Sequence, residues 1–228
     1  MKQIIPLTKK ERIRGVIYVI FQVFFLPLVI VLVSDQLPTP LSEIAQNMLF
    51  FAINFLCVVV IFRRFLWTSF LNVKGRLFRV LRCAAIGFLL YYGANYVVSF
   101  LILVFYPDFA NVNDSSIMAM VQQHPNLMTF ATVFLVPVVE ETLYRGLIFG
   151  GIYRRSPFLA YVVSTILFSA IHIIGYIRLY DPITLLLCFC QYIPAGIVLG
   201  WTYAKSGTIW CPVLIHMTVN QIGMLFMR

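Results

Sequence analysis

Two adjacent carboxylates, Glu140 and Glu141, stand close to Arg145, directly after the apolar run 129–139. On a helix, Glu141 and Arg145 are four residues apart and share a face, whereas Glu140 is turned about 100° away from Glu141. A guanidinium keeps its charge under ordinary conditions, so Arg145 can form a fixed structural pair with Glu141. Glu140 is then available as a general base.

Two further groups of polar side chains interrupt apolar sequence later in the chain. His172 lies four residues after Phe168, and Asn220 lies four residues after His216, on the same helical face. A histidine can transfer protons or bind a metal ion, and a histidine with an asparagine can donate hydrogen bonds to a developing oxyanion. Together with Glu140, these residue types are suited to hydrolysis by an activated water.

Each of these features also has a purely structural interpretation. A buried Glu–Arg pair can join two helices, and a single histidine on an apolar helix is often a packing residue. Three such interruptions within 100 residues, at helical spacing and at similar depth along their helices, favour one shared site, because ionisable residues inside a membrane usually serve a function.

The composition identifies the elements that must position these residues as membrane helices. The 228 residues are 61% hydrophobic and 11% charged, with a mean hydropathy of +0.93. A bilayer core needs roughly 20 mostly apolar residues per helix. We therefore expect an all-α transmembrane bundle of about seven spans, or eight if 65–81 or 113–123 is a further short helix. The windows are 16–33, 47–65, 80–105, 127–150, 160–177, 182–203 and 208–227.

The net charge of +9 is explained by topology rather than by nucleic-acid binding. If loops alternate across the membrane, all 17 Lys and Arg residues except Arg178 and Arg228 fall on one side. The positive-inside rule then predicts a cytoplasmic N-terminus and no nucleic-acid partner. The loop carboxylates Asp35, Glu43, Asp108, Asp114 and Asp181 fall on the other side.

We divide the chain into three parts. Residues 1–15 are a basic cytoplasmic lead-in that contacts anionic lipid, residues 16–126 hold three membrane helices and an external loop, and residues 127–228 form a catalytic membrane core. His124, in the external loop, has no partner at ligand spacing, and the five cysteines are interpreted as small apolar residues rather than as a disulfide or metal site.

The motifs Glu140-Glu141-x-x-x-Arg145, Phe168-x-x-x-His172 and His216-x-x-x-Asn220, in this order, resemble those of the CPBP family of intramembrane proteases, also called the Abi family. Its relatives include CAAX prenyl endopeptidases and proteins of bacteriocin processing and self-immunity. The resemblance implies that Glu140 and His172 activate a water, that His216 and Asn220 stabilise the oxyanion, and that Glu141 and Arg145 support the site.

A metal ion is an open alternative at this stage. The family is often described as metalloproteases, and Glu140, His172 and His216 are chemically suitable as three zinc ligands. The chain has no His-Glu-x-x-His motif, and a water activated by glutamate needs no metal. We favour a reaction that requires no cofactor, with zinc as the alternative.

We therefore expect an intramembrane endopeptidase that cleaves membrane-presented peptides or proteins, in a bacterial plasma membrane with the lipid bilayer as its surroundings. One rival is a non-catalytic immunity or regulatory protein that uses the same cavity for binding. A second is a transporter with a Glu/His proton relay, for which the sequence shows no paired repeat.

Overall fold

The computed structural model describes residues 4–227, and these residues form helices and connecting turns with no β-strand. The all-α prediction is confirmed. The helices before residue 125 are α1 (Lys9–Phe24), α2 (Leu26–Asp35), α3 (Glu43–Ile61), α4 (Arg63–Leu71), α5 (Leu77–Phe105) and α6 (Val112–Gln123). The following elements are α7 (Pro125–Phe130), η1 (Ala131–Leu135), α8 (Val136–Glu140), η2 (Glu141–Phe149), α9 (Gly150–Tyr153), α10 (Pro157–Ile171), η3 (Ile174–Tyr176), α11 (Pro182–Ser206) and α12 (Trp210–Met227).

Five helices are long and apolar enough to cross a membrane, and a sixth span results if α1 and α2 are counted together. The expected window 16–33 is bent by 49° between α1 and α2. Pro27, in the first turn of α2, has no N–H to continue the hydrogen bonds of α1, which accounts for the break. The window 160–177 corresponds to α10, which is shorter. The count of seven therefore stays a prediction, as does the orientation of the N-terminus.

Of the two stretches that the sequence offered as a further short helix, only 113–123 lies within a single helix. The stretch 65–81 contains part of α4 and the beginning of α5, and the stretch 113–123 lies within α6. Neither α4 nor α6 is long enough to span a bilayer, since a span needs roughly 20 residues.

The helix Pro125–Tyr153, which carries the two glutamates, contains two π-helical segments. In the first, the N–H of Val136 donates to the carbonyl of Ala131, five residues earlier. The next residue, Pro137, has no N–H to give to the carbonyl of Thr132 in the same register. The second segment begins at Glu141. Such segments are frequent at functional sites, and here one lies on each side of Glu140.

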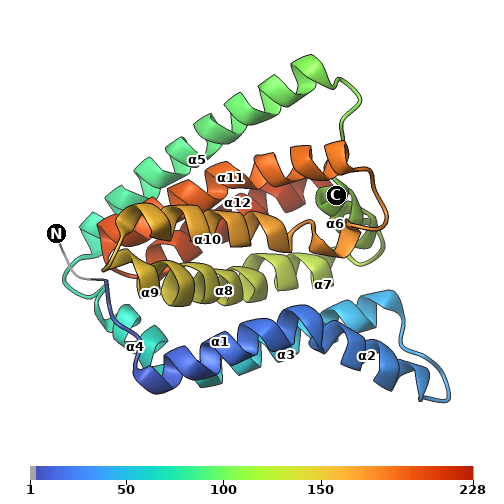
Figure 1. The fold of residues 1–228 in the computed structure, drawn as a ribbon, viewed down its shortest axis with the longest axis horizontal. Helices are drawn as coiled ribbons and strands as arrows, with labels where there is room; N and C mark the ends of the chain where they lie inside the picture. Colours follow the sequence, from blue (N-terminus) through green and yellow to red (C-terminus); the bar gives the residue numbers. More distant parts are fainter. Residues whose placement is uncertain (1–3, 228) are drawn as a thin grey trace.

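The helices form layers (Figure 1). The first layer contains α1, α2 and α3. The helix Pro125–Tyr153 lies between this layer and the group formed by α10, α11 and α12, and α5 packs on α11 and α12 but diverges from α11 toward its own C-terminal end. The carboxylates of the central helix are therefore surrounded by helices from both halves of the chain.

The close contacts among these helices depend on small residues, as the spacing of Gly196 and Gly200 predicts. A Cβ atom added to Gly196 would lie 2.9 Å from the Cα atom of Thr165 on α10. A Cβ atom on Gly146 would lie 2.8 Å from the ring of Phe65 on α4. Both approaches are closer than side chains allow, so these glycines set the distance of α10 and α4 from the helices that carry the polar residues.

The lead-in has a structural role that the sequence did not reveal. Glu11 is buried and accepts a hydrogen bond from the backbone N–H of Phe65, at 3.0 Å, at the start of α4. Its other carboxylate oxygen accepts from the backbone and hydroxyl of Thr8, which caps α1. Residues 8–11 are thus docked on α4.

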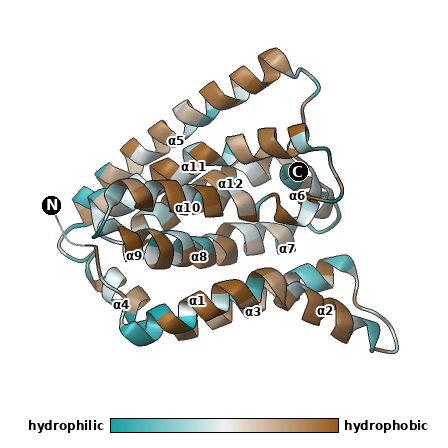
Figure 2. Cartoon of the chain, in the orientation of Figure 1, coloured by the Kyte–Doolittle hydropathy of each residue, from teal (hydrophilic) through white to brown (hydrophobic). Residues whose placement is uncertain are grey.

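The outer surface is apolar along most of its length (Figure 2). Exposed hydrophobic side chains cover α5, α1 and α2, among them Phe24, Leu89, Phe100 and Phe105. Hydrophilic residues gather at the N-terminal end of α1 and in the loop after α5. This distribution matches helices whose outer faces contact lipid rather than water.

Candidate active site

A cavity of about 480 Å³ lies between α3, α5, α6, α11, α12 and the central helix. All four residues predicted to be catalytic line it, namely Glu140, His172, His216 and Asn220. These residues come from three different helical segments separated by up to 80 positions in the sequence. The structure thus brings the predicted residues to one place, while their chemical roles stay predictions.

Glu141 and Arg145 form a buried ion pair behind this cavity. Arg145 Nη1 lies 3.2 Å from Glu141 Oε1, and both side chains have 0% exposure. Arg145 Nη2 also donates to the backbone carbonyl of Ala195 at 3.0 Å, and the guanidinium lies 4.0 Å from the centre of the Phe168 ring. These contacts satisfy the charge from several sides and make Arg145 a connection between the central helix, α10 and α11.

His216 lies between the two glutamates. Its Nδ1 atom is 2.9 Å from Glu141 Oε1, and its Nε2 atom is 3.9 Å from Glu140 Oε2. A carboxylate accepts hydrogen bonds, so His216 donates through Nδ1 and directs Nε2 toward the cavity. Glu141 is therefore more than a partner for Arg145, because it also sets the orientation of a cavity-lining histidine.

Glu140 has a different environment from Glu141. The Oε2 atom of each glutamate is buried without a hydrogen-bond partner, but Oε1 of Glu141 is bonded to both Arg145 and His216. The side chain of Glu140 is 19% exposed, whereas that of Glu141 is 0% exposed. Successive residues on a helix point in different directions, and this alone separates one carboxylate that is paired from one that faces a cavity. The separation of the two glutamates agrees with the arrangement expected from helical spacing.

We expected His172 to lie inside a membrane span. In the structure it lies directly after the last residue of α10. Its Nδ1 atom lies 2.8 Å from the carbonyl oxygen of Phe168, which can only accept. The side chain thus satisfies one of the carbonyls that a helix leaves without a partner at its end. This bond places the proton of the neutral ring on Nδ1 and leaves Nε2 as the acceptor.

Asn220 is held by a backbone carbonyl that Pro137, which has no N–H, leaves without a hydrogen bond. Its Nδ2 atom donates to the carbonyl of Thr132 at 2.7 Å, the carbonyl that receives no hydrogen bond from Pro137. A carboxamide nitrogen has two N–H groups, so one is used for this contact and one is left for a group in the cavity. The π-helical segment therefore orients the asparagine.

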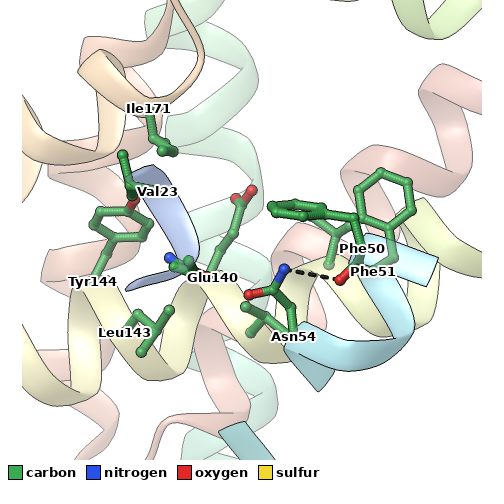
Figure 3. A pocket seen from close by; sticks show the side chains of 11 residues that line it. Val23, Phe50, Phe51, Asn54, Glu140, Leu143, Tyr144 and Ile171 are labelled. Atoms are coloured by element: carbon green, nitrogen blue, oxygen red, sulfur yellow. Dashed lines mark hydrogen bonds between the residues drawn. The ribbon is translucent and has the colours of Figure 1, made fainter. Parts of the chain in front are cut away.

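Glu140 also borders a second, smaller cavity of about 80 Å³ on the side of α1 and α3. Apolar side chains of α3 and the central helix, including Phe50, Phe51 and Leu143, line most of it (Figure 3). Asn54 contributes a carboxamide that is fixed by the carbonyl of Phe50 at 2.8 Å. Glu140 is thus at the boundary between a polar cavity and an apolar pocket.

The zinc alternative requires three ligands close together. Among residues 4–227, no three His, Cys, Asp or Glu side chains lie near enough to one another to hold a metal ion. Glu140, His172 and His216 therefore do not form the three-ligand set of the zinc alternative in this arrangement. We derive no step that involves a metal.

The remaining candidates from the sequence lie outside the cavity. His124 is partly exposed at the junction of α6 and α7. All five cysteines are free, and Cys188 is fully buried.

Sequence reasoning missed several cavity residues that the structure adds. They are Tyr91, Asn95 and Ser99 on α5, Asn111, Asn113 and Asp114 at the beginning of α6, and Gln191 and Tyr192 on α11. Tyr91 lies within the expected third window, and its side chain lines the cavity. Asn111, Asn113 and Asp114 were assigned to an external loop and gave no signal of proximity to His172.

Comparison with known proteins indicates the same group of proteins as the sequence motifs do. Residues 122–222 match the family model described as Type II CAAX prenyl endopeptidase Rce1-like. The "Putative membrane peptidase YdiL" of Bacillus subtilis is 29% identical over 109 residues, which are 47% of this chain and 40% of that protein. The chain thus covers less than half of the length of that relative.

Two further relatives extend the match. An uncharacterized 24.3 kDa protein of Escherichia coli is 28% identical over 79% of this chain and 82% of its own length. The UPF0177 protein YxdF of Lactococcus lactis is 26% identical over 57% of this chain and 67% of its own length. No solved structure matches at a significant level. The resemblance to the CPBP family is confirmed, and the apolar helices with these matches identify a multi-pass membrane protein related to membrane proteases.

Proposed function

We propose that this chain is an intramembrane endopeptidase of the Rce1-like type, and that Glu140 is the base that activates the hydrolytic water. The observation that carries the proposal is the free Oε2 atom of Glu140, which is buried without a partner and faces His216 Nε2 at 3.9 Å across the cavity. A buried carboxylate oxygen without a hydrogen bond is unfavourable, so its position opposite His216 in a cavity that His172 also lines supports a role in chemistry.

In the first step, Glu140 takes a proton from a water while the oxygen of that water attacks the carbonyl carbon of the scissile peptide bond. The gap between Glu140 Oε2 and His216 Nε2 is too long for a direct hydrogen bond and suits a small molecule that contacts both. A new C–O bond forms, and the carbonyl oxygen becomes an oxyanion.

Asn220 is suited to stabilise this oxyanion because its second N–H is not used by Thr132. His216 can assist only when Nε2 carries a proton, since Nδ1 already donates to Glu141. The two ring nitrogens of His216 face Glu141 and Glu140, respectively.

In the second step, the C–N bond breaks and the leaving amine takes the proton that Glu140 received. His172 offers an acceptor at Nε2 near the reacting groups and can hold the water or pass the proton onward. The products are a carboxylic acid and an amine, which balance one water and one peptide bond. In this assignment, Glu140 and His172 still act on the water and Asn220 still stabilises the oxyanion. His216 assists only when its Nε2 atom carries a proton.

The substrate we propose is a peptide or protein segment presented at the membrane, because the polar cavity is enclosed by helices with apolar outer faces. The apolar pocket beside Glu140 suits an apolar group of the substrate next to the scissile bond. The proposed location is a bacterial plasma membrane. A non-catalytic immunity or regulatory protein would use the same cavity for binding alone, but no feature of the site favours it.

The test uses the full chain reconstituted into liposomes with a library of quenched-fluorescent amphipathic peptides whose central residues are randomised. Wild-type protein should cleave members of the library, and Glu140→Gln should reduce the rate by about 100-fold or more. Glu43→Gln is the matched control, because Glu43 also lines the cavity but has no contact with a histidine, and it should cleave normally. Equal cleavage by wild type and a folded Glu140→Gln variant would contradict the assignment of Glu140 as the base.

A further inference from the structure

The ring of His172 is stacked on the ring of Tyr192 from α11. Their centroids lie 4.0 Å apart and their planes differ by 22°. His172 lies directly after the last residue of α10, before the short η3. Phe168 contacts the imidazole through its carbonyl and, edge to face, through its ring at 4.8 Å, and the stack on Tyr192 holds the plane of the imidazole and hence the direction of Nε2.

Tyr192 is itself held by its hydroxyl. Asn113 Nδ2 donates to Tyr192 Oη at 3.0 Å, and Tyr192 Oη lies 3.1 Å from Asp114 Oδ1, to which it donates. A phenol has one proton to donate, so these two contacts define its orientation, with Asn111 Oδ1 at 3.4 Å as a longer second acceptor.

The beginning of α6 is built to hold these partners in place. Asn111 Oδ1 accepts hydrogen bonds from the backbone N–H groups of Asn113 and Asp114 as the cap of α6. Asn111 Nδ2 donates to Gln191 Oε1 at 2.7 Å, next to Tyr192 on α11. The first turn of α6 is therefore docked on the same turn of α11 that carries Tyr192.

The surroundings of Asp114 agree with a functional position. Burial raises the pKa of Asp114, while the hydrogen bond from Tyr192 and the charge of His172 act in the opposite direction. The Asp114 side chain is solvent-exposed and lines the cavity, and it is within electrostatic reach of His172.

We propose that Tyr192 is a positioning residue for His172, and that Asp114 and Asn113 hold Tyr192 in the orientation that the stack requires. The inference rests on the proposed endopeptidase activity and deepens it. The first turn of α6 then takes part in alignment of the site, and α6 must be docked on α11 for His172 to direct Nε2 into the cavity. Tyr192 acts through His172 and does not touch the reacting atoms.

The test compares variants that separate the ring from the hydroxyl, with the same liposomes and peptide library. Tyr192→Leu removes the stack and should lower kcat by about 10- to 100-fold, the loss expected for a small misplacement of a reacting group, with KM changed less than about twofold. Tyr192→Phe keeps the ring and should restore most of kcat, and Asp114→Ala should lie between the two. Tyr96→Leu is the control, because Tyr96 is exposed on α5 and stacks on Phe100, away from the residues that line the cavity.

A second readout does not depend on activity. The chain has three histidines, so isotope labelling of histidine rings gives few NMR signals, and His172→Gln identifies the one from His172. Tyr192→Leu should shift and broaden the His172 signal, Tyr192→Phe should leave it close to wild type, and Tyr96→Leu should not change it. Thermal unfolding of each variant verifies that it is folded.

The cleavage assay and the NMR measurement together distinguish failure of the positioning role from failure of the endopeptidase proposal. An unchanged His172 signal in Tyr192→Leu, or an unchanged kcat, would overturn the positioning role. If the library is cleaved equally by wild type and Glu140→Gln, the endopeptidase proposal fails, and the ring signal still decides whether Tyr192 positions His172.

Discussion

The Nδ1 atom of His216 lies 2.9 Å from Oε1 of Glu141, which is also the oxygen that Arg145 contacts. One carboxylate oxygen therefore orients a histidine and neutralises an arginine at the same time. This relationship determines which nitrogen of His216 faces Glu140. It gives the pair Glu140-Glu141 two separate functions, one facing the cavity and one behind it.

The buried pair of Glu141 and Arg145 predicts a specific pattern of stability. Arg145→Met leaves the Glu141 carboxylate buried without its ion pair and should destabilise the protein by about 3–5 kcal/mol. The double variant Glu141→Gln/Arg145→Met removes both charges and should recover a large part of this loss. Thermal unfolding in detergent measures both effects.

Arg155→Met is the control for this experiment, because Arg155 is exposed at the end of α9, and its melting temperature should stay at the wild-type value. If Arg145→Met melts like wild type, the ion pair does not stabilise the fold in the way described.

Much of the site could be predicted from the sequence, because it depends on helical periodicity and on unusual polar residues. Glu141 and Arg145 share a face by their spacing, as do His216 and Asn220, and the structure shows each set on one side of its helix. In an apolar chain, few alternatives exist for residues that cannot face lipid. The all-α class follows from the same apolar composition, since backbone groups must be satisfied within each helix.

Other features could not be predicted because they depend on contacts between distant segments. The stack of His172 on Tyr192 and the docking of Asn113 on the same tyrosine join α6, α10 and α11. No local pattern marks Asn113 as different from a loop residue. Likewise, Phe50 and Phe51 of α3 border Glu140 only because the first layer packs on the central helix.

The boundaries of helices were also beyond sequence analysis. His172 was expected inside a span and instead follows the end of α10, where its side chain replaces a backbone donor at Phe168. The π-helical segments on either side of Glu140 arise from Pro137 and from tertiary packing, and hydropathy contains no signal for them.

Asn220 should be sensitive to the loss of its amide. Asn220→Ala removes the donor proposed for the oxyanion and should lower kcat by about 100- to 1,000-fold, with a smaller effect on KM. Asn220→Asp keeps the shape but replaces the donor with an acceptor, so it should be equally impaired. Steady-state cleavage of the peptide library measures both variants.

Thr218→Ala is a suitable control, because Thr218 lies on the same helix but is exposed and bonds only to its own helix at Leu214. It should cleave at the wild-type rate. A fully active Asn220→Ala variant would remove Asn220 from the proposed oxyanion site.

Metal removal should leave the activity intact. Among residues 4–227 the candidate ligands Glu140, His172 and His216 do not form a three-ligand group, and the proposed steps use only the carboxylate, the histidines and Asn220. Incubation with a chelator followed by dialysis should therefore change the rate less than about twofold. Elemental analysis of the purified protein, with zinc added back as a control, accompanies the assay. Loss of activity that zinc restores would contradict the metal-independent reaction.

Asp114 predicts a dependence of stability on pH. Burial raises its pKa above the ordinary value of 3.8 in the folded state. A raised carboxyl pKa means that the folded protein binds the proton more tightly than the unfolded chain does. The stability that this contributes is present below the unfolded pKa and is lost as the pH rises through the folded pKa. The melting temperature should therefore decrease over this window in wild type.

Asp114→Asn removes the titrating group but keeps an oxygen that can accept the hydrogen bond from Tyr192, so the contact to α11 is retained. In this variant the melting temperature should depend less steeply on pH as the pH rises above the ordinary carboxyl pKa of 3.8. Asp108→Asn, in the exposed loop before α6, is the control and should keep the wild-type slope. If the slopes of wild type and Asp114→Asn coincide, the carboxyl group of Asp114 is not desolvated by the docking of α6 on α11.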